Sequence, residues 1–213
     1  MRSLIIVLPS LASGLIGAIW LYFQPQVVEP RLEPRLPLGI ALMLGVGTAG
    51  VLVAGAYVLE RVLPSFAKAS RLLQHALARF NINLVTALLL AVISGVSEEV
   101  LFRGALLNWL TTFSPGYLAV FLQAVLFAAF HPMPRWAWSY TFYTLIAGVV
   151  LGFLVTITGT LWSGVTAHIL VNFHGFLEVR SHAKSGAWGI SITTQQRAED
   201  VPDDGKVTDD SNT

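Results

Sequence analysis

Residues 84–110 read LVTALLLAVISGVSEEVLFRGALLNWL, and this stretch decides the fold. Its length and apolar character are sufficient for a helix that crosses the hydrocarbon core of a bilayer, about 30 Å thick. Three ionisable residues interrupt it: Glu98, Glu99 and Arg103. Because an ionisable group inside a membrane is costly, such groups indicate a functional site by default.

Five further apolar segments lie on either side of this one, at residues 4–23, 38–59, 117–130, 140–158 and 160–177. The composition agrees with membrane residence, since 54% of the residues are hydrophobic, 12% are charged and the mean hydropathy is +0.67. Soluble domains carry about twice that charged fraction. We therefore expect an all-α, polytopic integral membrane bundle of about six transmembrane helices.

The composition also excludes several classes of function. A net charge of +1 offers no basic field for phosphates, so no nucleic-acid partner is expected. Cysteine is absent, which excludes disulfides, thiolate metal sites and a cysteine nucleophile. Every aspartate lies beyond residue 199, so the spans cannot form an aspartyl dyad.

The chain divides into three parts. Residues 1–83 hold two N-terminal spans and a basic segment, residues 84–178 hold the intramembrane polar groups, and residues 179–213 form a polar tail that we expect to be disordered. The basic segment, residues 60–83, fits either an interfacial amphipathic helix or a solvated loop. The first span could be a signal peptide, but its length and its aromatic end favour a retained helix.

The basic residues predict the orientation of the chain in the membrane. With the N-terminus inside, almost all of them fall in inner segments, and only Arg31 and Arg35 lie in outer loops. Both termini are therefore expected in the cytoplasm.

Two glycine patterns lie within apolar segments. Gly45, Gly47 and Gly50 match the dinucleotide-binding pattern GxGxxG, but no strand precedes them and they sit inside a span. Gly148 and Gly152 form a GxxxG pair. Small residues in membrane helices allow close backbone approach, so both patterns predict helix packing.

The charged residues of the central segment separate into a pair and a single carboxylate. Glu99 and Arg103 stand four positions apart with the glutamate first, the favoured order for a helical ion pair. Glu98 lies about 100° round the same helix, so Arg103 cannot serve both carboxylates equally. Glu98 is therefore a candidate general base.

Other spans supply groups that could complete a catalytic site. His131 ends one span behind Phe127, and His168 stands four positions before Asn172 on another. Together with Glu98 they could surround one buried water and hydrolyse an amide. We assign packing or capping to His174.

At these residues the chain resembles the CPBP (Abi) intramembrane proteases, a family that includes type II CaaX prenyl endopeptidases and bacteriocin-immunity proteins. The family pattern is EExxxR, then FxxxH, then HxxxN or HxxxB, each on its own helix. The matching residues, within 84–178, are Glu98-Glu99-Val-Leu-Phe-Arg103, Phe127-Ala-Ala-Phe-His131 and His168-Ile-Leu-Val-Asn172.

The resemblance implies a helical membrane fold with a polar catalytic cavity that opens toward the cytosol. It implies that Glu98 activates the attacking water with the assistance of His131. His168 and Asn172 would then stabilise the oxyanion, while Glu99 and Arg103 would hold the first motif in place.

Metal dependence and substrate stay open at this stage. Glu98, His131 and His168 could ligate a catalytic zinc ion, but no HExxH spacing favours zinc, so we expect no metal or other cofactor. The substrate would be a membrane-associated or lipidated protein or peptide, prenylated or not, cut near its C-terminus or beside the membrane. We expect a prokaryotic plasma-membrane protein in contact with lipids, of unspecified oligomeric state.

One geometric difficulty and two rival functions accompany this interpretation. Counting along the helices places Glu98 near mid-membrane and His131 nearer the cytosol, which calls for a kink near Ser94–Gly95 or a helix that begins just before Glu98. Ser97 followed by downstream histidines would suit a rhomboid-like serine protease. A non-catalytic adaptor or bacteriocin self-immunity protein could use the same fold.

Overall fold

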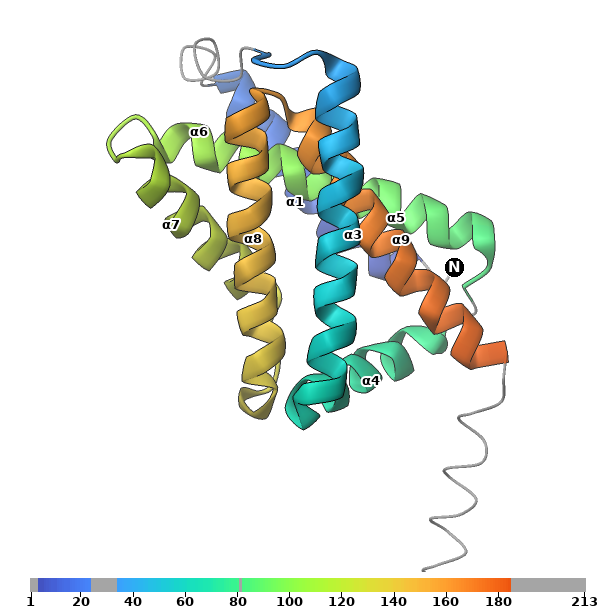
Figure 1. The fold of residues 1–213 in the computed structure, drawn as a ribbon. Helices are drawn as coiled ribbons and strands as arrows, with labels where there is room; N and C mark the ends of the chain where they lie inside the picture. Colours follow the sequence, from blue (N-terminus) through green and yellow to red (C-terminus); the bar gives the residue numbers. More distant parts are fainter. Residues whose placement is uncertain (1–3, 24–33, 81, 185–213) are drawn as a thin grey trace, which may run out of the picture.

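The computed structural model describes residues 4–23, 34–80 and 82–184, and all the elements in them are helical (Figure 1). In chain order the helices are α1 (Leu4–Phe23), α3 (Leu38–Val62), α4 (Pro64–Ala78), α5 (Leu84–Glu99), the π-helix η1 (Val100–Leu106), α6 (Leu107–Leu110), α7 (Gly116–Ala129), the 3₁₀ turn η2 (Arg135–Ala137), α8 (Trp138–Thr158) and α9 (Leu161–Lys184). The described residues contain no strand, so the all-α class is confirmed for them.

Three helical stretches are long and apolar enough to cross a membrane: Leu38–Val62, Leu84–Leu110 and Arg135–Thr158. Val7–Phe23 and Gly116–Ala129 are apolar but shorter. Large apolar side chains remain exposed on these helices, among them Met43, Val51, Val85, Leu89, Phe142 and Ile157. Such a surface suits lipid rather than water. The count of six spans stays a prediction.

Helices α5, η1 and α6 follow one another directly, and this rod runs across α3 and α8 rather than beside them (Figure 1). The expected kink near Ser94–Gly95 is not needed, because α5 runs through these residues and continues past Glu98. Glu98 Oε2 and His131 Nε2 lie 3.5 Å apart, so the fold brings the two side chains together without that kink.

Close packing of α1 accompanies the π-helical segment. The amide of Leu107 bonds to the carbonyl of Phe102, the five-residue spacing of a π-helix. A Cβ added at Gly17 of α1 would lie 2.8 Å from the backbone of Leu101. One added at Gly14 would lie 2.6 Å from the hydroxyl of Ser97. Small residues thus seat α1 directly on the segment that carries the charged residues.

Helix α9 packs against both α3 and α5 and brings its histidine to the central segment. A Cβ on Gly45 would lie 2.6 Å from the carbonyl of Ser163 in α9, whereas Gly47 and Gly50 face open space. The packing interpretation of this motif therefore holds for its first glycine. Gly148 and Gly152 both lie against α7, at contact distance from Ala124 and Val120 respectively, as GxxxG packing predicts.

The structure decides the conformation of the basic segment and places the end of the last helix later than expected. The basic segment forms helix α4, which buries Phe66 and exposes Lys68 and Arg71, so the solvated-loop alternative is wrong. Helix α9 continues to Lys184, past the expected start of the tail at residue 179. Val179 is buried in an apolar cluster, and this contact favours a longer helix. Residues 185–213 lie outside the described part of the chain.

Candidate active site

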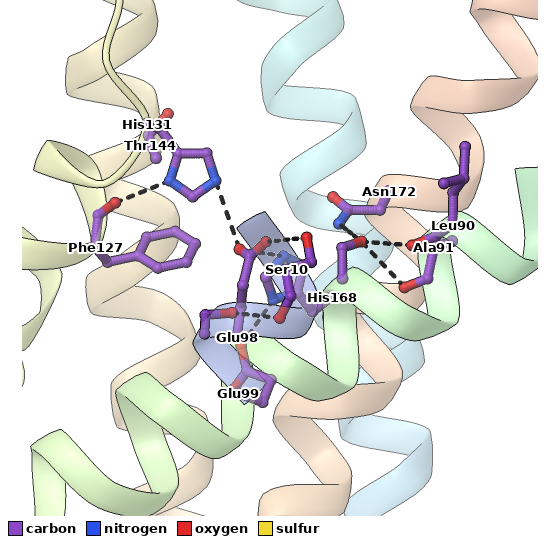
Figure 2. Close-up of polar contacts among 12 residues, drawn as sticks. Ser10, Leu90, Ala91, Glu98, Glu99, Phe127, His131, Thr144, His168 and Asn172 are labelled. Carbon is purple, nitrogen blue, oxygen red and sulfur yellow. Dashed lines mark hydrogen bonds and ion pairs between the residues drawn. The ribbon is translucent and has the colours of Figure 1, made fainter. Parts of the chain in front are cut away.

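A cavity of about 350 Å³ lies between the helices, and the predicted site residues face it from several of them. Most of its wall is apolar. The polar groups at one part of the wall are Ser10 from α1, Glu98 from α5, His131 from the end of α7, and His168 and Asn172 from α9. Figure 2 shows Ser10, His131 and His168 around Glu98, with Asn172 to one side.

Glu99 and Arg103 form the predicted pair, and neither residue is among those that line the cavity. Both side chains are completely buried, and Arg103 Nη1 donates to Glu99 Oε1 at 2.7 Å. Arg103 Nη2 also donates to the carbonyl of Gly148 at 3.3 Å, and the guanidinium lies 4.4 Å from the ring centre of Phe127. These contacts hold the Glu99 and Arg103 side chains in place.

His168 joins the two glutamates. Its Nδ1 lies 2.9 Å from Glu99 Oε1, and its Nε2 lies 3.6 Å from Glu98 Oε2. Because the Glu99 carboxylate can only accept, Nδ1 is the donor. In the neutral ring Nε2 then carries the lone pair, and it points toward Glu98.

His131 approaches Glu98 from the other side. Its Nδ1 lies 2.9 Å from the carbonyl oxygen of Phe127 and must donate to it, because a carbonyl accepts only. Its Nε2 lies 3.5 Å from Glu98 Oε2. The Phe127 ring also packs against both imidazoles, with ring centres 4.7 Å from His131 and 5.8 Å from His168.

Glu98 is therefore a buried carboxylate that faces the cavity. Its side chain is 7% exposed, and its Oε2 has no hydrogen-bond partner among the residues that the structure describes. That oxygen faces the Nε2 atoms of His131 and His168 at distances too long for direct hydrogen bonds. Glu99 Oε2 also has no such partner, but it lies against the backbone at Gly164 rather than at the cavity. Three groups that can accept or exchange a proton thus surround one point of the cavity.

Asn172 lies one helical turn beyond His168 and lines the same cavity. Its Nδ2 donates to Ser94 Oγ at 2.9 Å, and Ser94 in turn donates to the carbonyl of Leu90 at 2.8 Å. Five of the six predicted residues thus form one contact network, and Asn172 stands beside it in the cavity wall. An amide nitrogen has two hydrogens, so one remains for a ligand.

The alternative zinc site would use Glu98, His131 and His168. Within the described ranges, no group of three histidine or acidic side chains is arranged to hold a metal ion. The Nδ1 atom of His168 contacts Glu99, so Nε2 is the ring nitrogen that faces Glu98 and the cavity.

Sequence reasoning missed three polar residues near the site. Ser10 Oγ approaches Glu98 Oε1 at 3.5 Å, and Ser94 holds Asn172. Gln123 is fully buried and donates to the Gly148 carbonyl at 3.0 Å, the oxygen that Arg103 also uses. Each of the three is a polar side chain within an apolar segment, and that feature of the sequence could have marked them as candidates.

Ser97 does not occupy the position that a serine protease would require. It packs against Gly14 of α1, and it is not among the residues that line the cavity with the histidines. The structure gives no support to the rhomboid-like alternative.

Among known protein families, residues 80–174 match the one described as type II CAAX prenyl endopeptidase Rce1-like. The resemblance to CPBP intramembrane proteases is thereby confirmed, and the family supports a membrane-embedded protease in general terms. The matched range includes all six predicted site residues. Comparisons with curated proteins and with solved structures gave no match.

Proposed function

We propose that this protein is an intramembrane endopeptidase that hydrolyses a peptide bond with a water molecule activated by Glu98. The observation that supports this most strongly is the placement of Glu98 Oε2. It is buried without a hydrogen-bond partner, faces two imidazoles and lies in a largely apolar cavity. A carboxylate in such surroundings is suited to accept a proton from water.

In the proposed reaction the water oxygen attacks the carbonyl carbon of the peptide bond while its proton passes to Glu98. The separations of 3.5 and 3.6 Å from the imidazoles leave Oε2 free to accept that proton. His131 assists through Nε2, because Nδ1 is held by Phe127. The proton then moves to the nitrogen of the departing amine, and the C–N bond breaks.

The negative charge that develops on the substrate oxygen needs hydrogen-bond donors. Asn172 supplies its second N–H. His168 supplies Nε2–H when both of its ring nitrogens are protonated, and the Glu99 carboxylate at Nδ1 stabilises that cation. Arg103 holds Glu99 and does not touch the reacting atoms.

The substrate in this proposal is a membrane-associated protein or peptide, prenylated or not, cut near its C-terminus or in a membrane-adjacent segment. The apolar wall of the cavity supports an apolar occupant. We further propose a metal-independent reaction, in a prokaryotic plasma membrane with both termini in the cytoplasm.

The decisive test uses the purified protein in detergent, with farnesylated and membrane-spanning peptides, with and without chelator. Glu98→Gln is the matched control. Cleavage by the wild type, insensitive to chelator and lost in Glu98→Gln, is the expected result. Chelator-sensitive cleavage would overturn the metal-free mechanism. No cleavage by folded wild type, with normal complementation by Glu98→Gln in cells, would favour a non-catalytic adaptor or immunity protein instead.

A further inference from the structure

The cavity contains a second polar group that the proposed chemistry does not use. We call it the acidic end of the cavity, and it consists of Tyr57, Glu60, His174 and Glu178. Two of these residues come from α3 and two from α9, the helices that pack most extensively against each other.

A hydrogen bond organises part of this group. The Tyr57 hydroxyl lies 3.1 Å from His174 Nε2, and which of the two atoms donates depends on the tautomer of the ring. His174 therefore has a polar role at the cavity wall, where packing or capping was expected.

The charge of the acidic end is not neutralised by direct pairing within the described ranges. Glu60 lies about one helical turn beyond Tyr57 on α3, and Glu178 lies about one turn beyond His174 on α9, so the Tyr57–His174 contact brings both carboxylates to the same part of the cavity wall. No ion pair joins either glutamate to a lysine or arginine among the side chains that the structure describes, those of residues 7–23, 34–80 and 82–182. A mostly apolar cavity thus ends in two carboxylates that could balance a positive charge.

The position of this end relative to the scissile site follows from helix geometry. Glu178 stands ten residues beyond His168 on α9, which corresponds to about 15 Å along the helix axis at 1.5 Å per residue. An extended peptide advances about 3.3 Å per residue, so the same length holds roughly four to five residues. One peptide could therefore reach both the unpartnered Glu98 and the acidic end.

We propose that the acidic end binds a basic side chain of the substrate, about four to five residues from the bond that is cut. This proposal rests on the protease function proposed above, and it specifies the substrate as an apolar peptide with one lysine or arginine at a fixed distance. The carboxylates would set the register of the peptide, while the apolar wall between them and Glu98 accepts the intervening side chains.

The test measures peptide binding separately from cleavage. The full-length Glu98→Gln variant in detergent is titrated with fluorescent, end-blocked apolar peptides that carry one lysine at successive positions, and with a peptide that has glutamine instead. We expect the best-placed lysine to tighten binding about fivefold to tenfold, an effect that weakens with salt. Mass spectrometry of wild-type cleavage products gives the distance from lysine to the cut bond.

Variants of the acidic end decide where the lysine is bound. Adding Glu60→Gln and Glu178→Gln should remove the gain from lysine. The matched control is Asp209→Asn with Asp210→Asn, which removes the same net charge outside the described residues and should keep the gain. If the acidic-end double variant does not fold, Glu178→Lys replaces it and should shift the preference from lysine to glutamate in the peptide. That reversal would not follow from a structural defect.

The outcomes separate the two proposals. Lysine-independent binding, or a lysine effect that survives in a folded Glu60→Gln, Glu178→Gln variant, would overturn the acidic subsite while leaving the protease intact. The proposal would also be overturned if the Asp209→Asn, Asp210→Asn control lost the tighter binding of the lysine peptide to the same extent, because net charge alone would then explain the effect. Lysine-dependent binding that needs Glu60 and Glu178, in a protein whose wild type cleaves none of the peptides, would support the subsite and overturn the protease.

Discussion

Glu98 and Glu99 are consecutive residues of the same helix, yet their surroundings differ sharply. Glu99 is completely buried, and its Oε1 accepts from Arg103 at 2.7 Å and faces His168 Nδ1 at 2.9 Å. Glu98 is also buried, but it borders the cavity, and one of its oxygens, which has no hydrogen-bond partner in the described part of the chain, faces two imidazoles. A rotation of about 100° per residue is enough to place the two carboxylates on different sides of the rod.

This difference gives two identical side chains different surroundings. Glu99 is held by Arg103 and His168, so its position is fixed. Glu98 pairs with no arginine or lysine among the described side chains and faces the imidazoles of His131 and His168. The comparison predicts that equivalent substitutions at positions 98 and 99 have unlike effects.

The largest expected effect is the loss of catalysis in Glu98→Gln. Glutamine keeps the shape of the side chain but cannot accept the proton of water, so kcat should fall about 10³-fold or more. Thermal unfolding in detergent should change little, because no hydrogen bond to Oε2 is lost. Peptide cleavage and unfolding would be measured on the same preparation. A variant that retains a tenth of the wild-type rate would contradict the assignment of Glu98 as base.

Glu99→Gln should instead act mainly on stability. Removing the charge of Glu99 leaves Arg103 buried without its counter-ion, which costs about 3–5 kcal/mol in comparable buried pairs. Reversible unfolding of the variant in detergent would measure this cost. Glu99→Gln combined with Arg103→Met should recover part of the stability, because neither charge then remains buried. Equal stability of the two single variants, Glu98→Gln and Glu99→Gln, would remove the distinction between the carboxylates.

Much of this contrast could be predicted from sequence, because it depends on spacing within one helix. The pair of Glu99 with Arg103 follows from their four-residue separation, and the separate direction of Glu98 follows from helical rotation. The apolar runs likewise predicted helix positions, and the first one coincides with α1, Leu4–Phe23.

The features that sequence did not predict depend on contacts between distant segments. His168 contacts both glutamates because α9 packs on α5 at Gly95, where a Cβ would lie 2.8 Å from Ile169. The partner of Asn172, Ser94, becomes clear only from that same packing. Neither the π-helical segment nor the crossing of α3 and α8 by the central rod leaves a periodic signal in an apolar run.

Gly164→Ala tests whether Glu99 must keep its position for catalysis. A Cβ at Gly164 would lie 2.5 Å from Glu99 Oε2 and 2.7 Å from a methyl group of Val155, so the carboxylate would have to move. We expect a loss of about 1–3 kcal/mol in stability and a lower kcat, because His168 loses its fixed partner. Unfolding and steady-state kinetics would measure both.

Gly47→Ala is the matched control for this substitution, because a Cβ on Gly47 meets nothing within 4 Å. Both changes favour helix formation by a similar amount, about 1 kcal/mol. Equal stability and activity of the two variants would show that Glu99 tolerates displacement.

The smallest effect is expected at Ser10, the residue of α1 that contacts Glu98. Its hydroxyl donates to Glu98 Oε1 at 3.5 Å, a long and therefore weak hydrogen bond. Ser10→Ala should lower kcat by about twofold to threefold without changing stability, as cleavage rates and thermal unfolding would show. A loss as large as that of Glu98→Gln would mean that Ser10 orients the carboxylate. In either case a measurable change would establish that α1 is part of the working enzyme, because a protein that had lost this span as a signal peptide could not respond to the substitution.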